Sequence, residues 1–304
     1  MEFIHKSVLF DESIKALNID DSKVIADGTA GGGGHSREIA KSAKHLIAID
    51  QDPDAIQVLN ERLGNFDNVT IVHNNFVNIK QILHQLGVEK IDGMLLDLGV
   101  SSFQLDTADR GFSFHKDAEL DMRMSKSGMS AKDVVNTYSE EALADILFKY
   151  GEEKFARRIA KNIVLARQEK EIETTFELVE IIKASYPQKA MRDSHPARKT
   201  FQAIRIEVNG ELDKLSHTLD DAFDCLSSGG RLAIITFHSL EDRIVKEKFA
   251  SWSKGCTCPK EFPVCICGNK PKGKCPQKAV APSEQELEIN PRARSSRLRV
   301  FEKA

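Results

Sequence analysis

The sequence predicts an α/β fold in which a parallel sheet is interrupted by an inserted helical domain. Over the first hundred residues, short apolar runs alternate with helix-compatible stretches, which is the pattern of β-α units around a parallel sheet. From about residue 106 to 195 only helical patterns occur, and an apolar run resumes near residue 231. We therefore expect a discontinuous sheet domain over 1–105 and 196–304, with an inserted helical domain over 106–195.

The individual elements follow from these runs in chain order. Four apolar runs predict strands at 24–27, 45–50, 69–73 and 91–97. Helical patterns between them predict helices at 35–41, from Pro53 onwards, and at 79–86. The inserted domain has helical patterns at 131–137, 140–149, 154–168 and 175–185. Beyond it we expect a long helical pattern over 198–226 broken by Gly210, a fifth strand over 231–237, a loop over 254–283, and a closing edge strand over 297–302.

Composition places the chain among globular proteins. Of its 304 residues, 41% are hydrophobic and 29% are charged, which disfavours disorder, collagen and coiled coil. No apolar run approaches the roughly 18 residues that a membrane span needs, and the first ten residues lack a signal-peptide pattern. We therefore expect a cytoplasmic protein without a membrane partner.

The net charge of −3 conceals an asymmetry between the two halves of the chain. Residues 1–153 carry 15 Lys and Arg against 26 Asp and Glu, whereas residues 154–304 carry 28 against 20. Such asymmetry hints at a polyanionic partner for the basic half, although local composition alone could also produce it. If the partner is polyanionic, the basic excess is expected to follow the inserted domain and the C-terminal motifs.

The six cysteines are distributed unevenly. Cys225 stands alone, and the other five lie within 20 residues, at Cys256, Cys258, Cys265, Cys267 and Cys275. Zinc sites usually space paired ligands by two to four residues, so the C-x-C pairs here are atypical. A structural zinc site and free thiols in a lysine-rich loop both remain open, and no residue is assigned as a metal ligand.

Three of the predicted strands end in an acid, at Asp27, Asp50 and Asp97. The first is followed by a glycine-rich loop and a helix start, which together form a cradle for a nucleotide-like cofactor. Asp50 lies about 20 residues further on, where a second-strand acid hydrogen-bonds ribose hydroxyls. NAD and S-adenosylmethionine both satisfy this pattern. Carboxylates at Asp27 and Asp97 and an aromatic ring at Phe76 favour S-adenosylmethionine, because carboxylates suit a cationic sulfonium and repel a pyrophosphate.

Longer motifs add a family resemblance. They are Asp27-Gly-Thr-Ala-Gly-Gly-Gly-Gly-His-Ser36, Leu95-Leu-Asp-Leu-Gly-Val-Ser-Ser102, Arg110-Gly-Phe-Ser-Phe114, Leu120-Asp-Met-Arg-Met124, His195-Pro-Ala-Arg198, Thr200-Phe-Gln-Ala-Ile-Arg205, Phe237-His-Ser-Leu-Glu-Asp-Arg243 and Asn290-Pro-Arg-Ala-Arg-Ser-Ser296. From Lys6 to Arg299 the chain resembles the bacterial 16S rRNA cytosine N4-methyltransferase family, often called MraW or RsmH.

The resemblance implies a class I (Rossmann-like) S-adenosylmethionine-dependent methyltransferase sheet with an inserted helical domain. It also implies N4-methylation of a decoding-centre (P-site) cytosine of 16S rRNA in the small ribosomal subunit. Carried over by motif, the cofactor-binding residues are Gly33, Gly34, His35, Asp50, Phe76, Asp97 and Gln104.

The expected chemistry needs a hydrogen-bond acceptor near the cytosine amine, whose lone pair is delocalised into the ring. Asp97 is the first catalytic candidate and His238 the second, although a helix-capping or packing role would equally explain His238. Methylation of a ring carbon would instead need a cysteine nucleophile. Neither 95–102 nor 236–243 contains a cysteine.

RNA contacts are expected from basic residues of the later motifs. The candidates are Arg198, Arg205, Arg243, Arg292 and Arg294, because phosphate neutralisation by such side chains drives RNA binding. Taken individually, each of them is more often part of a solvated surface. The alternatives are a methyltransferase acting on another RNA or a protein, and a noncatalytic ribosome-assembly factor built on the same fold.

Overall fold

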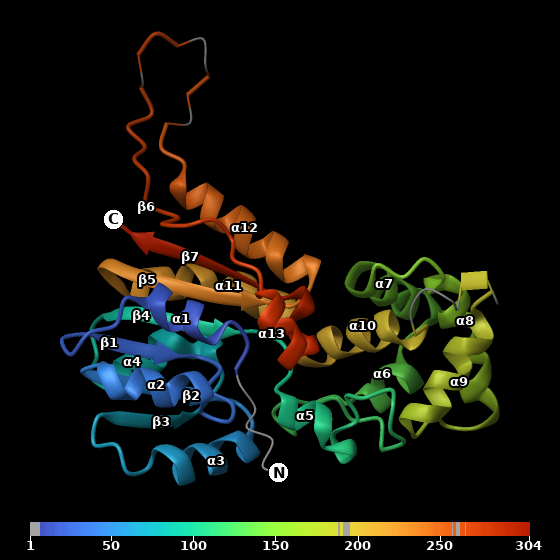
Figure 1. The fold of residues 1–304 in the computed structure, drawn as a ribbon. Helices are drawn as coiled ribbons and strands as arrows, with labels where there is room; N and C mark the ends of the chain where they lie inside the picture. Colours follow the sequence, from blue (N-terminus) through green and yellow to red (C-terminus); the bar gives the residue numbers. More distant parts are fainter. Residues whose placement is uncertain (1–6, 188, 191–194, 257, 260–261, 265) are drawn as a thin grey trace. The chain divides into compact units, whose positions relative to one another are not determined.

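The computed structural model describes residues 7–187, 189–190, 195–256, 258–259, 262–264 and 266–304. The chain divides into two compact units (Figure 1). The sheet unit comprises Met1–Gly99 and Leu212–Ala304, and the helical unit comprises Val100–Glu211. No helix in the described ranges is both long and apolar enough to cross a membrane.

The sheet unit is built on a seven-stranded sheet in the order β3-β2-β1-β4-β5-β7-β6. The strands are β1 (Val24–Asp27), β2 (His45–Asp50), β3 (Val69–His73), β4 (Ile91–Asp97), β5 (Leu226–Thr236), β6 (Gly273–Lys274) and β7 (Arg297–Lys303). Strands β1 to β5 pair in parallel, and β7 runs antiparallel to both β5 and β6. The predicted α/β fold class is confirmed.

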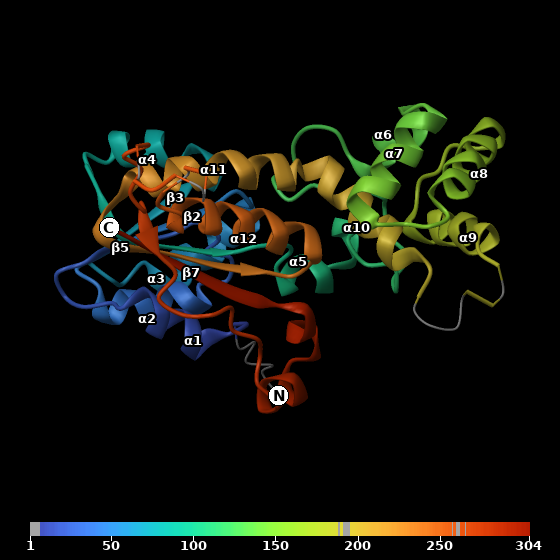
Figure 2. The ribbon, with the colours of Figure 1, turned by 90° about the horizontal axis from the view of Figure 1, so that it is seen from above.

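Helices cover both faces of this sheet (Figures 1 and 2). One face carries α1 (Phe10–Leu17), α2 (Gly34–Ser42) and α3 (Pro53–Leu63), and the other carries α4 (Ile79–Gln85), α11 (Glu211–Cys225) and α12 (Ser239–Ser253). Because both faces are covered, the central strands read as nearly continuous apolar runs rather than alternating ones. The four central residues of β2, for example, are all buried.

Two expectations for the sheet unit need correction. Strand β7 is not an edge strand, because the loop after α12 returns as the two-residue strand β6 and pairs with its outer side. Helix α1 was not predicted from the sequence. It has only eight residues, and its N-cap, Leu9, has a left-handed backbone and no side-chain cap, so the usual start signal is missing.

The helical unit surrounds its own hydrophobic core. Its elements are α5 (Ser102–Asp106), the 3-10 helix η2 (Ala108–Arg110), α6 (Ala131–Thr137), α7 (Glu140–Gly151), α8 (Ala156–Glu169), α9 (Thr175–Ser185) and α10 (Ala197–Asn209). Side chains of Ser130, Ser139 and Thr174 cap α6, α7 and α9, which explains where these helices begin.

The helical unit is wider than the 106–195 expected from the sequence. Helix α10 packs closely on α7, since a Cβ added at Gly151 would lie 2.7 Å from the carbonyl oxygen of Lys199. Its buried residues Phe201 and Ile204 belong to the core of the helical unit. The long helical pattern does break at Gly210, where φ is +57°, as expected.

Asn209 fastens the end of α10 to an irregular segment of the helical unit. Its Oδ1 accepts a hydrogen bond from the backbone N–H of Met124 at 2.9 Å, and its Nδ2 donates to the carbonyl oxygens of Met122 at 2.8 Å and Arg205 at 2.9 Å. Met122 has a φ of +60°, a left-handed conformation that is costly for a non-glycine residue. The Asn209 amide therefore holds a strained turn against the helix.

Replacing Asn209 by Ala should lower the free energy of unfolding by about 2 to 4 kcal/mol, because buried backbone groups lose their partners. Urea denaturation followed by circular dichroism measures the change. The exposed Asn60, whose Nδ2 donates to a single carbonyl in α3, provides the control, and Asn60→Ala should cost less than about 1 kcal/mol. Equal losses in the two variants would contradict this role of Asn209.

Candidate functional site

The candidate site is formed where β1, β2 and β4 end at one edge of the sheet. Because these strands are parallel and adjacent, their terminal residues Asp27, Asp50 and Asp97 meet at their carboxyl ends, which is where open α/β sheets bind ligands. The loop between β1 and α2 crosses this edge. Its backbone is tied on both sides, as Gly28 N donates to Leu95 O at 2.9 Å and Ala30 N donates to Ile49 O at 3.0 Å.

Glycines in this loop are required by its geometry. Gly31 and Gly33 have φ of +51° and +79°, which side-chain-bearing residues rarely adopt. A Cβ at Gly28 would lie 2.6 Å from the Leu96 side chain. Gly33 is the N-cap of α2 and provides no side-chain cap. The first N–H groups of α2 are therefore not capped by a side chain and can donate to a ligand.

Asp50 holds the loop in place while retaining acceptor capacity. Its Oδ2 accepts from Gly31 N at 2.7 Å and its Oδ1 accepts from Asp52 N at 2.8 Å. The backbone N–H of Gln51 also donates to this carboxylate, so three of its roughly four acceptor positions are used and one can still accept a hydrogen bond from a hydroxyl. Burial is the main cause that raises the pKa of Asp50 above its usual value.

Asp27 is fully enclosed beneath the loop. Its side chain accepts hydrogen bonds from Ser36 Oγ at 2.6 Å and from Thr29 N at 3.2 Å. Burial raises the pKa of Asp27 to about 6, against the lowering effect of these two hydrogen bonds. Asp27 therefore titrates near neutrality.

Asp97 is the carboxyl group whose environment opposes its negative charge most strongly. Its Oδ1 is buried and has no hydrogen-bond partner among the described residues, while the side chain as a whole is 24% exposed. Burial, followed by the nearby charges of Asp27 and Glu241, raises the pKa of Asp97 well above its usual value. A cation or a hydrogen-bond donor placed at Oδ1 would satisfy this group.

His35 and Phe76 complete the surroundings of the loop. His35 is buried and stacks on Phe10 with ring centroids 5.6 Å apart. Burial lowers the pKa of His35 to about 4, so its ring is neutral at pH 7 and its Nδ1, 3.8 Å from Oδ2 of Asp97, forms no ion pair there. Phe76 begins the 3-10 helix η1 (Phe76–Asn78). A Cβ added at Gly28 would lie 3.0 Å from the Cβ of Phe76, which places Cβ of Phe76 beside the loop.

Six of the seven expected cofactor residues therefore gather at one edge of the sheet: Gly33, Gly34, His35, Asp50, Phe76 and Asp97. Gln104 is part of the helical unit. There its Oε1 accepts from Ser101 N at 3.0 Å while its own N–H donates to Ser101 Oγ at 3.2 Å, a capping box that starts α5. This local role explains why the side chain is buried, and its cofactor contact stays a prediction.

His238 caps α12. Its Nδ1 accepts from Glu241 N at 3.4 Å, and Oε2 of Glu241 accepts from Phe237 N at 2.8 Å. His238 Nε2 lies 3.2 Å from Oε1 of Glu241. The capping role, one of the two explanations open from the sequence, thus accounts for this histidine, and Asp97 stays the first catalytic candidate.

Sequence reasoning missed four residues of this site. Thr29 accepts from Asp97 N at 2.6 Å through its Oγ1, Ser36 bonds Asp27, Phe10 stacks on His35, and Glu241 is buried and raises the pKa of Asp97. The spacing of His238 and Glu241 matches a capping box and could have revealed Glu241. The other three depend on contacts made in the folded chain and have no comparable sequence signal.

The five arginines proposed for RNA contact differ in their surroundings. Arg198, Arg243, Arg292 and Arg294 are exposed. Arg205 is 16% exposed, and its Nε and one terminal nitrogen donate to the two carboxylate oxygens of Glu211 at 2.8 and 2.9 Å. A phosphate would therefore have to displace Glu211 from Arg205.

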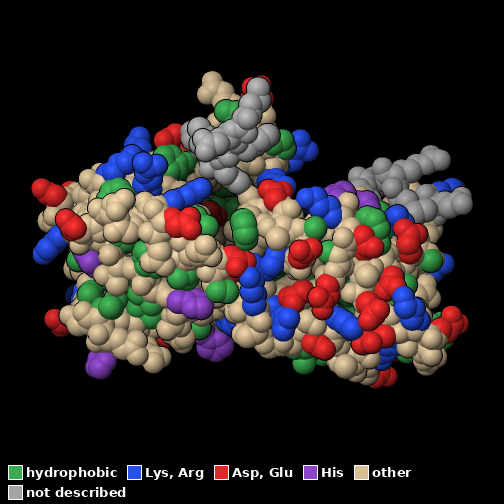
Figure 3. All heavy atoms as spheres, turned by 90° about the horizontal axis from the view of Figure 1, so that it is seen from below, with side chains coloured by type: hydrophobic (Ala, Val, Ile, Leu, Met, Phe, Trp, Pro, Cys, Tyr) green, Lys and Arg blue, Asp and Glu red, His purple; other side chains and the backbone are tan. Residues whose placement is uncertain are grey.

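The expectation of a basic inserted domain is wrong for the helical unit taken as a whole. Residues 100–211 contain 18 Lys and Arg and 19 Asp and Glu. On the face of this unit drawn in Figure 3, basic and acidic side chains are interspersed. The basic excess after residue 154 coexists with an acidic first half of the same unit, so any attraction for a polyanion must come from individual exposed side chains.

Comparisons with known proteins agree with the motifs. The family model described as the MraW methylase family matches residues 2–304. Ribosomal RNA small subunit methyltransferase H 2 from Agathobacter rectalis is 58% identical, covering 100% of this chain and 99% of that protein. Ribosomal RNA small subunit methyltransferase H from Clostridium botulinum strain Kyoto is 56% identical, covering 100% of both chains.

Among solved structures, a rRNA methylase from Streptococcus thermophilus is similar with a TM-score of 0.42 and 13% identity, covering 97% of this chain and 93% of that chain. The family membership therefore rests on the sequence matches, which extend over the whole chain. They confirm the resemblance carried by the motifs: the chain belongs to the MraW methylase family.

Proposed function

We propose that this methylase transfers a methyl group from S-adenosylmethionine to the exocyclic amine, N4, of a cytosine in the decoding centre (P site) of 16S rRNA. The substrate would be the small ribosomal subunit, so the enzyme would act in the cytoplasm. Membership of a methylase family and relatives named for small-subunit ribosomal RNA support this reaction. The structural observation that carries it is the group of carboxyls Asp27 and Asp97, with raised pKa values, beside a glycine cradle.

The carboxyl groups at this edge of the sheet fit the positive charge of S-adenosylmethionine. When bound, this cofactor supplies an electrophilic methyl group on a cationic sulfonium. Asp50 would accept a hydrogen bond from a ribose hydroxyl, since its three backbone donors leave the carboxylate with acceptor capacity. Phe76 would lie beside the adenine, and the loop glycines let the backbone approach closely.

Asp97 would act on the cytosine amine. Its buried Oδ1, which has no partner among the described residues, would accept an N–H of the amine and favour the rehybridisation that frees the nitrogen lone pair. The raised pKa of Asp97 makes this carboxyl a suitable place for the proton that leaves the methylated nitrogen. Most of the remaining acceleration would come from holding the two reactants in line.

The proposal predicts tritium transfer from labelled S-adenosylmethionine to small subunits that lack this modification. The label should appear in N4-methylcytidine after nuclease digestion and mass spectrometry. Asp97→Asn should lower kcat by about a hundredfold or more, the usual contribution of a positioned proton acceptor. Asp21, an exposed acid ahead of β1, provides the matched control, and Asp21→Asn should leave kcat unchanged.

Label in 5-methylcytidine or in ribosomal protein would refute the proposed reaction. A protein that binds S-adenosylmethionine and small subunits without any transfer would instead support a noncatalytic assembly factor.

A second prediction concerns pH. The pKa of Asp27 is raised to about 6, so its negative charge, which attracts a cation, is lost as the pH falls through 6. Affinity for S-adenosylmethionine should therefore weaken by up to about tenfold per pH unit below that value for each proton taken up. S-adenosylhomocysteine lacks the sulfonium charge, so its affinity should change less. Calorimetric titration of both ligands between pH 5 and 8 tests this, and Asp27→Asn should flatten the difference; parallel pH profiles for the two ligands would contradict it.

A third prediction concerns RNA. Arg198 lies exposed near the start of α10, and Arg198→Ala should weaken binding to small subunits and reduce the salt dependence of log K by about one. Affinity for S-adenosylmethionine should remain the same. Lys41→Ala, which removes an exposed charge at the end of α2, controls for net charge. Loss of both ligands in Arg198→Ala would indicate a folding defect and remove the support for an RNA contact.

A further inference from the structure

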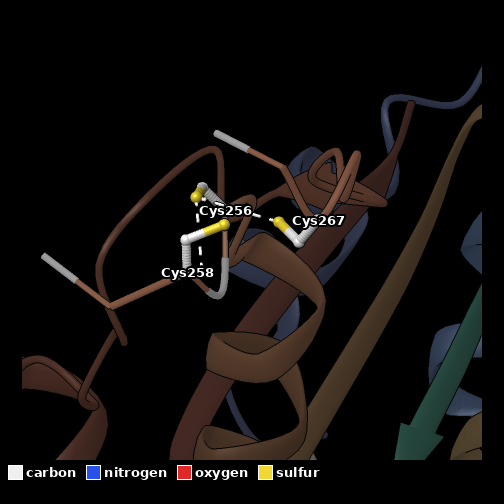
Figure 4. A group of neighbouring side chains, drawn as sticks. All are labelled: Cys256, Cys258 and Cys267. Carbon is white, nitrogen blue, oxygen red and sulfur yellow. Dashed lines mark hydrogen bonds between the residues drawn. The ribbon is translucent and has the colours of Figure 1, made fainter. Parts of the chain in front are cut away.

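Three cysteines approach one another in the loop that leaves α12 and returns at β6. The Sγ atoms of Cys256, Cys258 and Cys267 all lie within 4.8 Å of each other (Figure 4). Cys256 and Cys258 belong to the start of the loop, and Cys267 comes from its returning half. The chain thus brings together side chains that are up to eleven positions apart.

The distance between the sulfurs distinguishes metal coordination from a disulfide. Sγ of Cys267 lies 3.8 Å from Sγ of Cys256. Thiolates bound tetrahedrally to zinc at about 2.3 Å are separated from each other by about 3.8 Å, whereas a disulfide would require about 2.05 Å. The described cysteines form no disulfide.

Backbone hydrogen bonds help to fix the positions of two of these sulfurs. The N–H of Cys258 donates to Sγ of Cys256 at 3.4 Å, and the N–H of Ile266 donates to Sγ of Cys258 at 3.4 Å. Hydrogen bonds donated to a metal-ligating sulfur orient the ligand.

The described part of the loop has little apolar packing to hold it. Phe262, Val264 and Ile266 are 46%, 69% and 75% exposed, and the returning segment first joins the sheet at the two residues of β6. A short segment that cannot bury a core commonly depends on a metal for its fold.

We propose that Cys256, Cys258 and Cys267 bind one zinc ion, which closes this loop as a structural site. Thiolate ligands select a soft or borderline cation such as zinc over calcium or magnesium. The C-x-C spacing is atypical only for ligands that act as a sequence pair; here a third thiolate, that of Cys267, comes from across the loop. Cys265 lies outside the described residues and is not assigned. Cys275 is separate from the group, with its Sγ 3.9 Å from Oγ of Ser253.

Elemental analysis of full-length protein, purified reduced and without a polyhistidine tag, tests the site. About one equivalent of zinc is expected per chain. The combined substitution Cys256→Ser, Cys258→Ser and Cys267→Ser should abolish zinc retention, and the matched control Cys275→Ser should keep it. Replacing zinc by Co²⁺ should produce thiolate-to-metal charge-transfer absorption in the control and not in the triple variant.

Limited trypsin digestion gives a readout independent of activity. Cleavage after Lys272, which is exposed in the loop and precedes Gly273, should become at least several-fold faster after chelation and in the triple variant. Unchanged S-adenosylmethionine binding in that variant would show that the sheet unit is still folded. Retention of zinc by the triple variant, absence of zinc from protein expressed with zinc in excess, or iron in its place would overturn the proposal.

Discussion

The structure depends on a conflict at the edge of the sheet, where parallel pairing forces carboxyl groups into a buried region that disfavours their charge. The pKa values of Asp27, Asp50 and Asp97 are all raised, with burial as the largest cause. Hydrogen bonds from Ser36, Thr29, Gly31 and Asp52 relieve the first two, and Asp97 is left with a buried oxygen lacking a described partner. A cationic ligand would offset this unfavourable environment, so the site favours ligands with positive charge.

Much of this arrangement could be predicted from the sequence because it follows from the periodicity of apolar residues and from the residues that begin and end each element. The apolar runs that form β1, β2 and β4 are mostly buried, whereas β3, at the edge of the sheet, is half-buried. The acids at the ends of β1, β2 and β4 could be predicted to lie together because the carboxyl ends of parallel strands meet at one edge of a sheet. Rules based on local sequence were sufficient for elements that have a clear apolar pattern.

The rest depended on contacts between distant residues. Helix α1 lacks a side-chain cap. Strand β6 has only two residues, too few for a sequence pattern to predict its pairing with β7. Assignment of α10 to the helical unit required its packing on α7. The role of Glu241 arises because α12 begins beside the end of β4, a fact of topology. Charge counts along the chain were misleading as well, because the helical unit combines an acidic first half with a basic second half.

The discontinuity of the sheet unit constrains the order in which the chain can fold. Strands β1 to β4 precede the helical unit, whereas β5 and β7 follow it. Once the chain has been synthesised as far as residue 211, all residues that form the core of the helical unit are present and can be buried. At that stage β4 still lacks its neighbour β5. During synthesis this open edge of β4 is therefore exposed until β5 arrives, and the later domain in sequence can consolidate before the earlier one.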